Sequence, residues 1–280
     1  MNLTRFWSRI RTLVPLGAYP LLAPLYRLRR RRHLARLERH DRAFGAAHPG
    51  VSFPPADMRY KVAGPCTVDL FWHSGELILA DIARAMATVG ATLAGPQSFL
   101  DFGCGCGRLA HAVAASMPDL RYAGCDIDRR AIGWCRDNLP GQSFVANGEH
   151  PPCPFPDGTF DVVWCGSVFT HIDEARQDEW LSELKRILKP GGLLLASVHG
   201  RDSWAGRLPA WVIRDLERTG FLFADTGADA GIHPDWYRVA WHSEAYIRRH
   251  WARFFDVAQY LAKGLNNHQD IVVCQKTGGP

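Results

Sequence analysis

The sequence lacks an uninterrupted apolar run long enough to cross a membrane. Its main apolar stretch, Leu13–Tyr26, has only 14 residues and contains three prolines, whereas a spanning helix needs about 20 apolar residues. An arginine block at residues 27–32, interrupted only by Leu28, follows at once, where a signal peptide would have a small-residue cleavage site. We therefore expect neither a spanning helix nor a cleaved signal peptide in this region.

The eight cysteines lack the spacing of a disulfide framework or a metal site. No Cys-x-x-Cys pair occurs in the sequence, and no ligand spacing typical of zinc is present. Scattered cysteines of this kind are typical of reduced thiols in a cytoplasmic protein. We therefore expect a cytoplasmic protein with no metal. The sequence also has no internal repeats. Its length of 280 residues suffices for one large domain with appendages.

Positive charge is concentrated at the N-terminus. Residues 1–42 contain eleven arginines, one Glu and one Asp, a net charge of +9; the whole chain carries +5, so the remainder carries −4. Three interpretations of this arm stay open. It is a docking helix with a solvated basic face, a peripheral anchor on the inner face of a membrane, or a nucleic-acid contact. The third is least favoured, because no RNA-binding module accompanies the arginines.

The most informative segment is Phe99–Arg108, with the sequence FLDFGCGCGR. An apolar pair ends in an acid, three glycines follow at alternate positions, and a helix-like segment begins. Glycine permits positive φ and close approach of a ligand to the backbone, and a helix N-terminus offers free N–H groups. The pattern predicts a strand, a ligand-binding turn and a helix.

The spacing of this turn distinguishes between nucleotide ligands. A dinucleotide site has the pattern G-x-G-x-x-G/A. Here the third glycine comes one residue early, and Arg108 stands where a small residue is needed. Asp101 suits a positive ammonium group rather than a pyrophosphate. These features favour S-adenosylmethionine, which has an amino-acid tail and no phosphate, and disfavour an NAD-dependent oxidoreductase.

Further strands follow at the expected intervals. Residues 120–126 read as a second strand that ends in Asp126, the place of an acid that binds ribose hydroxyls; Asp128 is the alternative. Residues 143–147 read as a third strand, 154–164 as a turn and a fourth strand, and 189–197 as a helix stop followed by a fifth strand; residues 255–261 and 270–275 read as a closing antiparallel hairpin.

These motifs, LDFGCGCGR, FPDGTFDVV and LKPGG, resemble those of class I S-adenosylmethionine-dependent methyltransferases over roughly residues 97–200. The resemblance implies a Rossmann-like α/β fold. Its sheet is mostly parallel, has seven strands and is closed by an antiparallel C-terminal strand, with helices on both faces. We expect a basic arm at 1–45, an N-terminal cap at 46–95, a core at 96–200, an insertion or acceptor lid at 201–240, and a C-terminal helix and hairpin at 241–280.

Ligands of open α/β sheets bind at the carboxyl ends of the strands, and this rule selects the candidate cofactor residues. Asp101 and the three loop glycines would hold the methionine part, and Asp126 the ribose. Asn147 or Glu149 would read the adenine; the sequence there departs from the G-D-A usual in the family. Gly166 and Ser167 would lie beneath the sulfonium. The predicted cofactor residues are Asp101, Gly103, Gly105, Gly107, Asp126, Asn147, Glu149, Gly166 and Ser167.

Methyl transfer needs a base only when the acceptor carries a proton. His171, after the fourth strand, is the first candidate, and His199, after the fifth, is the second. A structural role for His171, capping the next helix, is an equally good interpretation. Aromatic and polar clusters at 71–73 and 233–242 suit either an acceptor lid or ordinary core.

We expect an enzyme that transfers a methyl group from S-adenosylmethionine to an oxygen or nitrogen of a small-molecule or glycan-like acceptor by in-line displacement, releasing S-adenosylhomocysteine. An aminopropyl transferase is disfavoured, because residues 165–169 lack the acidic pair that the resemblance to that class would require. A catalytically silent, cofactor-binding scaffold with a membrane-peripheral arm is the alternative.

Overall fold

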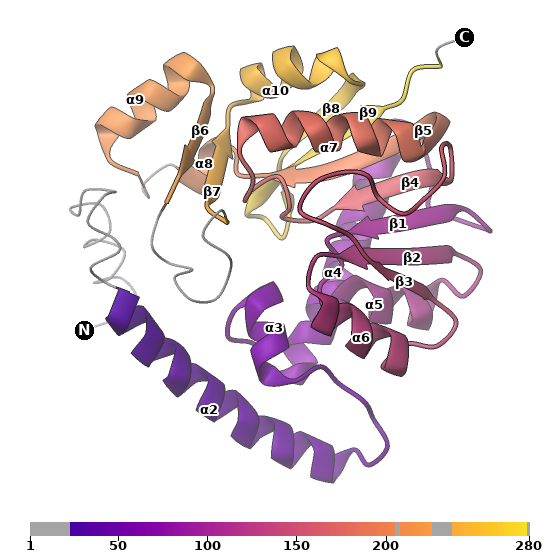
Figure 1. The fold of residues 1–280 in the computed structure, drawn as a ribbon, viewed down its shortest axis with the longest axis vertical. Helices are drawn as coiled ribbons and strands as arrows, with labels where there is room; N and C mark the ends of the chain where they lie inside the picture. The colour runs from indigo at the N-terminus through magenta and orange to yellow at the C-terminus, as the bar shows by residue number, and fades with distance from the viewer. Residues whose placement is uncertain (1–22, 205–207, 226–236, 279–280) are drawn as a thin grey trace.

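The computed structural model describes residues 23–204, 208–225 and 237–278. Three helices precede the first strand: α2 (Ala23–Ala47), α3 (Ala56–Ala63) and α4 (Val68–Ala87). In Figure 1, α2 runs along the outer edge of the molecule, and α3 lies between it and the sheet. No helix within the described ranges is long and apolar enough to cross a membrane.

A seven-stranded sheet has the order β3-β2-β1-β4-β5-β9-β8. The first five strands are parallel, while β9 is antiparallel to both β5 and β8. This arrangement confirms the expected fold class and its closing hairpin. The order reverses between β1 and β4, which creates a ligand-binding crevice at the carboxyl ends of these strands. The strands are β1 (Ser98–Phe102), β2 (Arg121–Asp126), β3 (Ser143–Ala146), β4 (Phe160–Cys165), β5 (Leu188–Val198), β8 (Asp256–Leu265) and β9 (Gln269–Gln275).

Helices cover both faces of the sheet (Figure 1). On one face, α7 (Glu174–Ile187), α10 (Glu244–His250) and the 3₁₀ turn η2 (Trp251–Arg253) pack on Leu100 and Val163. On the other, α4, α5 (Arg108–Ser116) and α6 (Arg129–Asn138) pack on Phe99 and Val162. Central strands are buried on both sides, which explains their nearly continuous apolar sequence.

The predicted N-terminal cap divides into two parts with different roles. Helix α4 places Ile78 and Ile82 in the core beneath the sheet, so it is a face-covering helix, whereas α3 lies at the cavity described below. Phe71 is buried in a small cluster with Met58, and Trp72 stacks on His111 with ring centroids 4.7 Å apart. Phe71 and Trp72 therefore follow the core interpretation rather than the lid interpretation, whereas His73 is exposed.

The insertion forms a small two-stranded sheet beside the main one. It comprises α8 (Arg201–Trp204), α9 (Ala210–Thr219), β6 (Phe221–Ala224) and β7 (Val239–His242), with β6 and β7 antiparallel. The backbone N–H of Ala240 donates to the carbonyl of Thr170 (2.8 Å), and that of His242 to the carbonyl of His199 (2.9 Å). The insertion is therefore bonded to the segments that follow β4 and β5. Of the aromatic and polar cluster predicted here, His233, Asp235 and Trp236 lie outside the described residues.

Candidate functional site

The glycine turn after β1 passes closely between two other segments. Gly103 and Gly105 have φ of +83° and +55°. A Cβ at Gly103 would lie 2.4 Å from Cγ2 of Val168, and one at Gly105 would lie 2.5 Å from Cγ2 of Val62. No side chain fits at either position. Glycine is therefore required for the close packing of this turn against Val168 and Val62, and the predicted contact of its backbone with a ligand stays a prediction.

Asp126 fixes the geometry of this turn from the end of β2. One carboxylate oxygen accepts from the backbone N–H of Gly105 (2.8 Å) and the other from that of Asp128 (2.8 Å). Burial raises the pKa of Asp126, and these two donors oppose the rise. Each carboxylate oxygen has further acceptor capacity, so Asp126 can hold the turn and still accept hydrogen bonds from two neighbouring hydroxyls of a ligand.

A cavity of about 600 Å³ opens at the carboxyl ends of the strands. Its wall brings together eight of the eleven predicted site residues: Gly103, Gly105, Asp126, Asn147, Glu149, Gly166, Ser167 and His171. Three others, Asp101, Gly107 and His199, do not line it. Their predicted contacts with a cofactor or an acceptor stay predictions.

Asp101 is buried in the sheet, only 4% exposed, and accepts a hydrogen bond from the Tyr122 hydroxyl (2.6 Å). Burial raises its pKa to about 7. Gly107 has a structural reason for its identity: it is the left-handed N-cap of α5, and a Cβ there would lie 2.5 Å from Cδ1 of Leu139. Gly107 therefore shapes the start of α5, while Asp101 is bonded to Tyr122 of β2.

Asn147 provides an observation that fits an adenine ring. Its side-chain nitrogen donates to the carbonyl of Gly148 (2.9 Å), while its Oδ1 atom is buried with no hydrogen-bond partner in the described structure. A buried acceptor without a donor is costly. Since Asn147 lines the cavity, an exocyclic amino group bound there would satisfy it.

Ser167 occupies a strained position directly after β4. Its φ is +60°, uncommon for a residue other than glycine. Its N–H donates to Oγ of Ser197 (2.7 Å), and its hydroxyl donates to Oε1 of Gln269 (3.1 Å). Backbone strain of this kind is held by its surroundings and clusters at functional sites.

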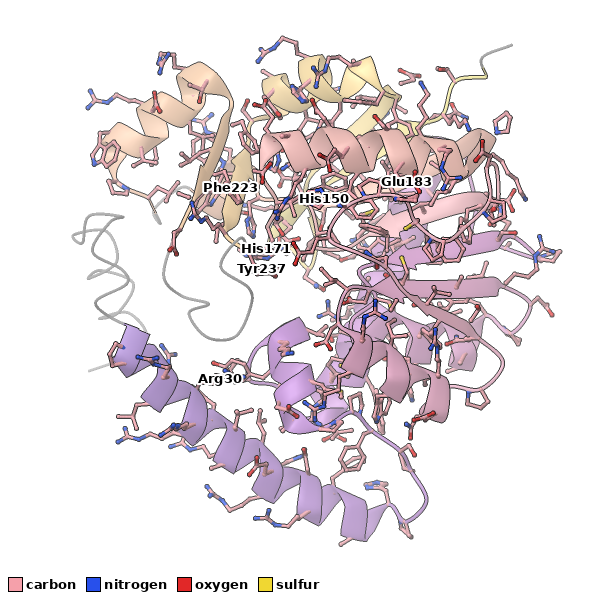
Figure 2. The ribbon with its side chains drawn as sticks, in the orientation of Figure 1. Arg30, His150, His171, Glu183, Phe223 and Tyr237 are labelled. Carbon is pink, nitrogen blue, oxygen red and sulfur yellow. The ribbon has the colours of Figure 1, made fainter. Side chains whose placement is uncertain are left out.

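His171 and Tyr237 line the cavity together and stack with centroids 4.0 Å apart, as their adjacent positions in Figure 2 show. Nδ1 of His171 lies 2.9 Å from the carbonyl oxygen of Arg238. A carbonyl only accepts, so Nδ1 carries the proton, and Nε2 is the nitrogen that gains or loses a proton. His171 therefore has the tautomer and the place that an acid–base or anion-binding role requires.

His199 is held differently. Its Nδ1 lies 3.1 Å from the carbonyl oxygen of Ala240, and its Nε2 lies 3.4 Å from the amide nitrogen of Gln269. Both ring nitrogens therefore contact protein groups. Its ring centroid lies 6.2 Å from that of His171. The geometry favours His171 over His199 for a direct contact with an acceptor.

Sequence reasoning missed the cationic groups of the cavity. Arg108 lines it at the start of α5 and has no hydrogen bond or ion pair with any described residue. Burial lowers its pKa, and the nearby Asp101 opposes this effect. Lys61 reaches the wall from α3 and donates to Asp128 (2.8 Å). The position of Arg108, directly after the last glycine of the turn, could have identified it as a cavity residue from sequence. No local sequence pattern predicts the pairing of Lys61 with Asp128.

The comparisons with known proteins agree with this geometry. Residues 100–196 match the family model described as "Methyltransferase domain". These residues contain β1 to β5 and the glycine turn, so this part of the chain is a methyltransferase domain. With the strand order above, the chain has the class I methyltransferase fold, as the sequence motifs predict.

Two curated relatives share the domain. The chain is 29% identical over 178 residues to the malonyl-[acyl-carrier protein] O-methyltransferase of Hahella chejuensis, covering 62% of this chain and 61% of the relative. It is 37% identical over 98 residues to the fatty-acid O-methyltransferase of Mycolicibacterium smegmatis, covering 34% and 35%. The chain thus spans less than two thirds of either relative.

Two solved structures share the fold. The pyocyanin biosynthetic protein PhzM superposes with a TM-score of 0.51 at 17% identity, over 77% of this chain and 60% of PhzM. The 1,6-didemethyltoxoflavin-N1-methyltransferase of Burkholderia thailandensis superposes with a TM-score of 0.50 at 16% identity, over 81% and 94%. These likenesses support the architecture alone.

Proposed function

We propose that this chain transfers a methyl group from S-adenosylmethionine to a carboxyl oxygen of an acyl-chain acceptor. The observation that carries the proposal is the cavity, whose wall contains the glycine turn and Asp126 together with Ser167, His171 and Tyr237. Contact of residues 1–42 with a membrane surface belongs to the same proposal, because a lipid-like acceptor would be met there.

The residues present fit the cofactor part by part. Asn147 would accept from the adenine amino group, and Asp126 would accept from the ribose hydroxyls. Arg108 would pair with the carboxylate of the methionine part, because a planar guanidinium matches a carboxylate. S-adenosylmethionine supplies a methyl group that is already activated by the sulfonium. The protein's task is therefore to align the acceptor and exclude water.

The class of acceptor follows from the relatives and from chemistry. The two curated relatives are named for O-methylation of malonyl-[acyl-carrier protein] and of fatty acids, and these names do not support the glycan-like acceptor expected from the sequence. A carboxylic acid is ionised at neutral pH, so its oxygen is nucleophilic without a general base. Ser167, His171 and Tyr237 would orient the carboxylate.

The first experiment is calorimetric titration with S-adenosylhomocysteine, with NADH as the control ligand. Asp126→Ala should weaken binding by about 10- to 100-fold, the value of hydrogen bonds to a charged group. Asp119→Ala, which removes an exposed carboxylate outside the cavity, should bind as the native protein does. Unchanged affinity in Asp126→Ala would count against the ribose assignment.

The second experiment tests the acceptor. Fatty acids, malonyl thioesters, alcohols and amines are incubated with S-adenosylmethionine, and release of S-adenosylhomocysteine is measured. The proposal expects turnover with the carboxylic acids. Turnover with alcohols or amines alone would refute the acceptor class, and tight cofactor binding without any turnover would favour the silent scaffold.

The pH profile then separates two roles of His171. With Nδ1 bonded to the Arg238 carbonyl, Nε2 binds a carboxylate only when the ring is protonated, whereas it accepts a proton from an alcohol only when the ring is neutral. For a carboxylate acceptor, the ratio of native activity to His171→Asn activity should fall as pH rises from about 5.5 to about 8.5, because only a protonated ring pairs with a carboxylate. An advantage that grows over this range would indicate base catalysis.

A further inference from the structure

Helix α2 exposes a surface formed almost entirely by arginine. The arginine face consists of Arg27, Arg29, Arg31, Arg32, Arg36, Arg39 and Arg42, all exposed, with Glu38 as its acidic member. At 100° per residue these arginines lie within an arc of about 200° and extend over about 22 Å of helix. This face carries far more charge than an ordinary solvated helix requires.

The opposite side of α2 fixes how the arginine face is presented. Leu37 and Phe44 are buried, and Phe44 packs against Phe53 and Trp72. The guanidinium of Arg59 on α3 is fully buried and pairs with Asp41 of α2 at 2.7 Å. Arg30, labelled in Figure 2, lies over the ring of Tyr60 on α3. The helix is thereby held against α3 with its arginines outward.

The arginine face makes no ion pair with any described residue. Arginines elsewhere in the chain do pair, as Arg130 does with Asp57 and Arg186 does with Glu183. Burial and the neighbouring Arg29 and Arg36 lower the pKa of His33, a sign of the local positive field. Seven guanidinium groups that make no ion pair within the described part of the chain repel one another, and an anionic surface would relieve this repulsion.

The sequence just before this face indicates which anionic surface fits. Leu13–Tyr26 is apolar, lies immediately N-terminal to Arg27 and includes Tyr19 and Tyr26, an aromatic type enriched at membrane interfaces. An apolar segment that enters the membrane interface and a polybasic segment that pairs with anionic headgroups both contribute to peripheral binding. Ribonucleic acid or an acidic protein would match the charge but would leave the apolar stretch without a function.

We propose that the arginine face of α2 docks the protein on a lipid surface rich in anionic headgroups. The rest of the chain, residues 43–280, has a net charge of −4, so an anionic surface would repel it. The protein would therefore bind with α2 toward the lipid. Since α3 joins α2 to the cavity through Met58, Lys61 and Val62, this orientation would place the cavity near lipid-like acceptors.

Vesicle sedimentation with the full chain tests the proposal without any need for turnover. Each arginine near an anionic surface contributes about 1 kcal/mol. Arg32→Glu combined with Arg39→Glu should therefore lower the affinity for phosphatidylcholine vesicles containing about 30% phosphatidylglycerol by at least about 30-fold. These residues are exposed and lie seven apart on one stripe of α2. Arg121→Glu combined with Arg249→Glu is the matched control, because both residues are exposed on β2 and α10 and the charge change is equal.

Four results support the proposal together. Native protein and control variant bind phosphatidylglycerol vesicles, the α2 variant does not, none binds pure phosphatidylcholine vesicles tightly, and binding weakens with salt. Equal loss in both variants, binding that does not depend on phosphatidylglycerol, or tighter binding to transfer RNA or to an acidic carrier protein than to the phosphatidylglycerol vesicles would overturn it. Circular dichroism and S-adenosylhomocysteine titration show whether each variant is folded, so a failure to bind vesicles would overturn the membrane contact and leave the cofactor and acceptor assignments to their own tests.

Discussion

Replacing Asp101 by asparagine should stabilise the protein at alkaline pH. Asp101 is buried on β1, and burial raises its pKa to about 7 from an ordinary value of 3.8. Between these two values the folded protein holds a proton that the unfolded chain releases. The contribution of this group to stability is therefore greatest below about pH 4 and falls as pH rises toward 7.

The size of the effect follows from this difference. One pKa unit corresponds to about 1.4 kcal/mol, so the free-energy cost of keeping Asp101 in the folded protein grows by about 3 kcal/mol between pH 5 and pH 8. The asparagine side chain in the Asp101→Asn variant has no proton to lose and keeps an oxygen that can accept from the Tyr122 hydroxyl. The variant should therefore gain about 3 kcal/mol over the native protein across this range.

Urea unfolding at pH 5 and pH 8 measures this difference. Asp161→Asn is the control. Burial opposes ionisation of Asp161, but hydrogen bonds from Lys189 and from the backbone of Ser98 outweigh the effect of burial and lower the pKa of Asp161. That variant should be less stable than the native protein by a similar amount at both pH values. Parallel pH dependence of the native protein and Asp101→Asn would refute the reasoning.

The same variant also tests the place of Asp101 relative to the cofactor. Because Asp101 does not line the cavity, S-adenosylhomocysteine should bind Asp101→Asn nearly as well as the native protein. A large loss of affinity would support the predicted contact of Asp101 with the cofactor.

Two further predictions concern the glycine turn and the attachment of α2. Gly105→Ala should destabilise the protein and weaken S-adenosylhomocysteine binding in a titration, because the new Cβ would lie 2.5 Å from Val62. The control is Gly141→Ala, also at positive φ but with no atom within 4 Å, which should cost only about 1–2 kcal/mol of backbone strain. Equal effects of the two substitutions would argue against the close approach of Val62. Arg59→Met should lower the free energy of unfolding by about 3–5 kcal/mol, because it leaves Asp41 without its buried partner. Hydrogen exchange should accelerate in α2, while β1 to β5 stay protected. Uniform acceleration would contradict a local role.

The architecture was predictable from sequence because its signals are local. A strand that ends in an acid, a glycine turn and a helix lie within 20 residues, and the second acid follows 25 residues after Asp101. The right-handed parallel crossover then places the ends of the strands at one edge. Eight predicted site residues accordingly meet in one cavity, Gly103, Asp126 and His171 among them.

The remaining features depend on contacts between distant segments. Lys61 meets Asp128 across 67 residues, and Arg238 meets His171 across 67 residues. His199 follows its strand as predicted, yet the carbonyl of Ala240 and the amide of Gln269 hold its ring outside the cavity wall. Spacing along the chain locates the end of a strand, but it does not show which neighbour will take a side chain's hydrogen bonds.

The bonding of β7 to the segments after β4 and β5 has a consequence for how such a protein can diversify. The insertion begins and ends beside the sheet, where Arg238, Ala240 and His242 donate to the carbonyls of His171, Thr170 and His199. Backbone groups make these three attachments, so they do not depend on the identity of most side chains in the insertion, although the side chains of Ser203 and His242 add bonds to His268 and Gln177. Exchanging residues 201–240 for the matching segment of a relative should therefore leave β1 to β5 in place, and a change in the acceptor used would test whether the insertion selects it.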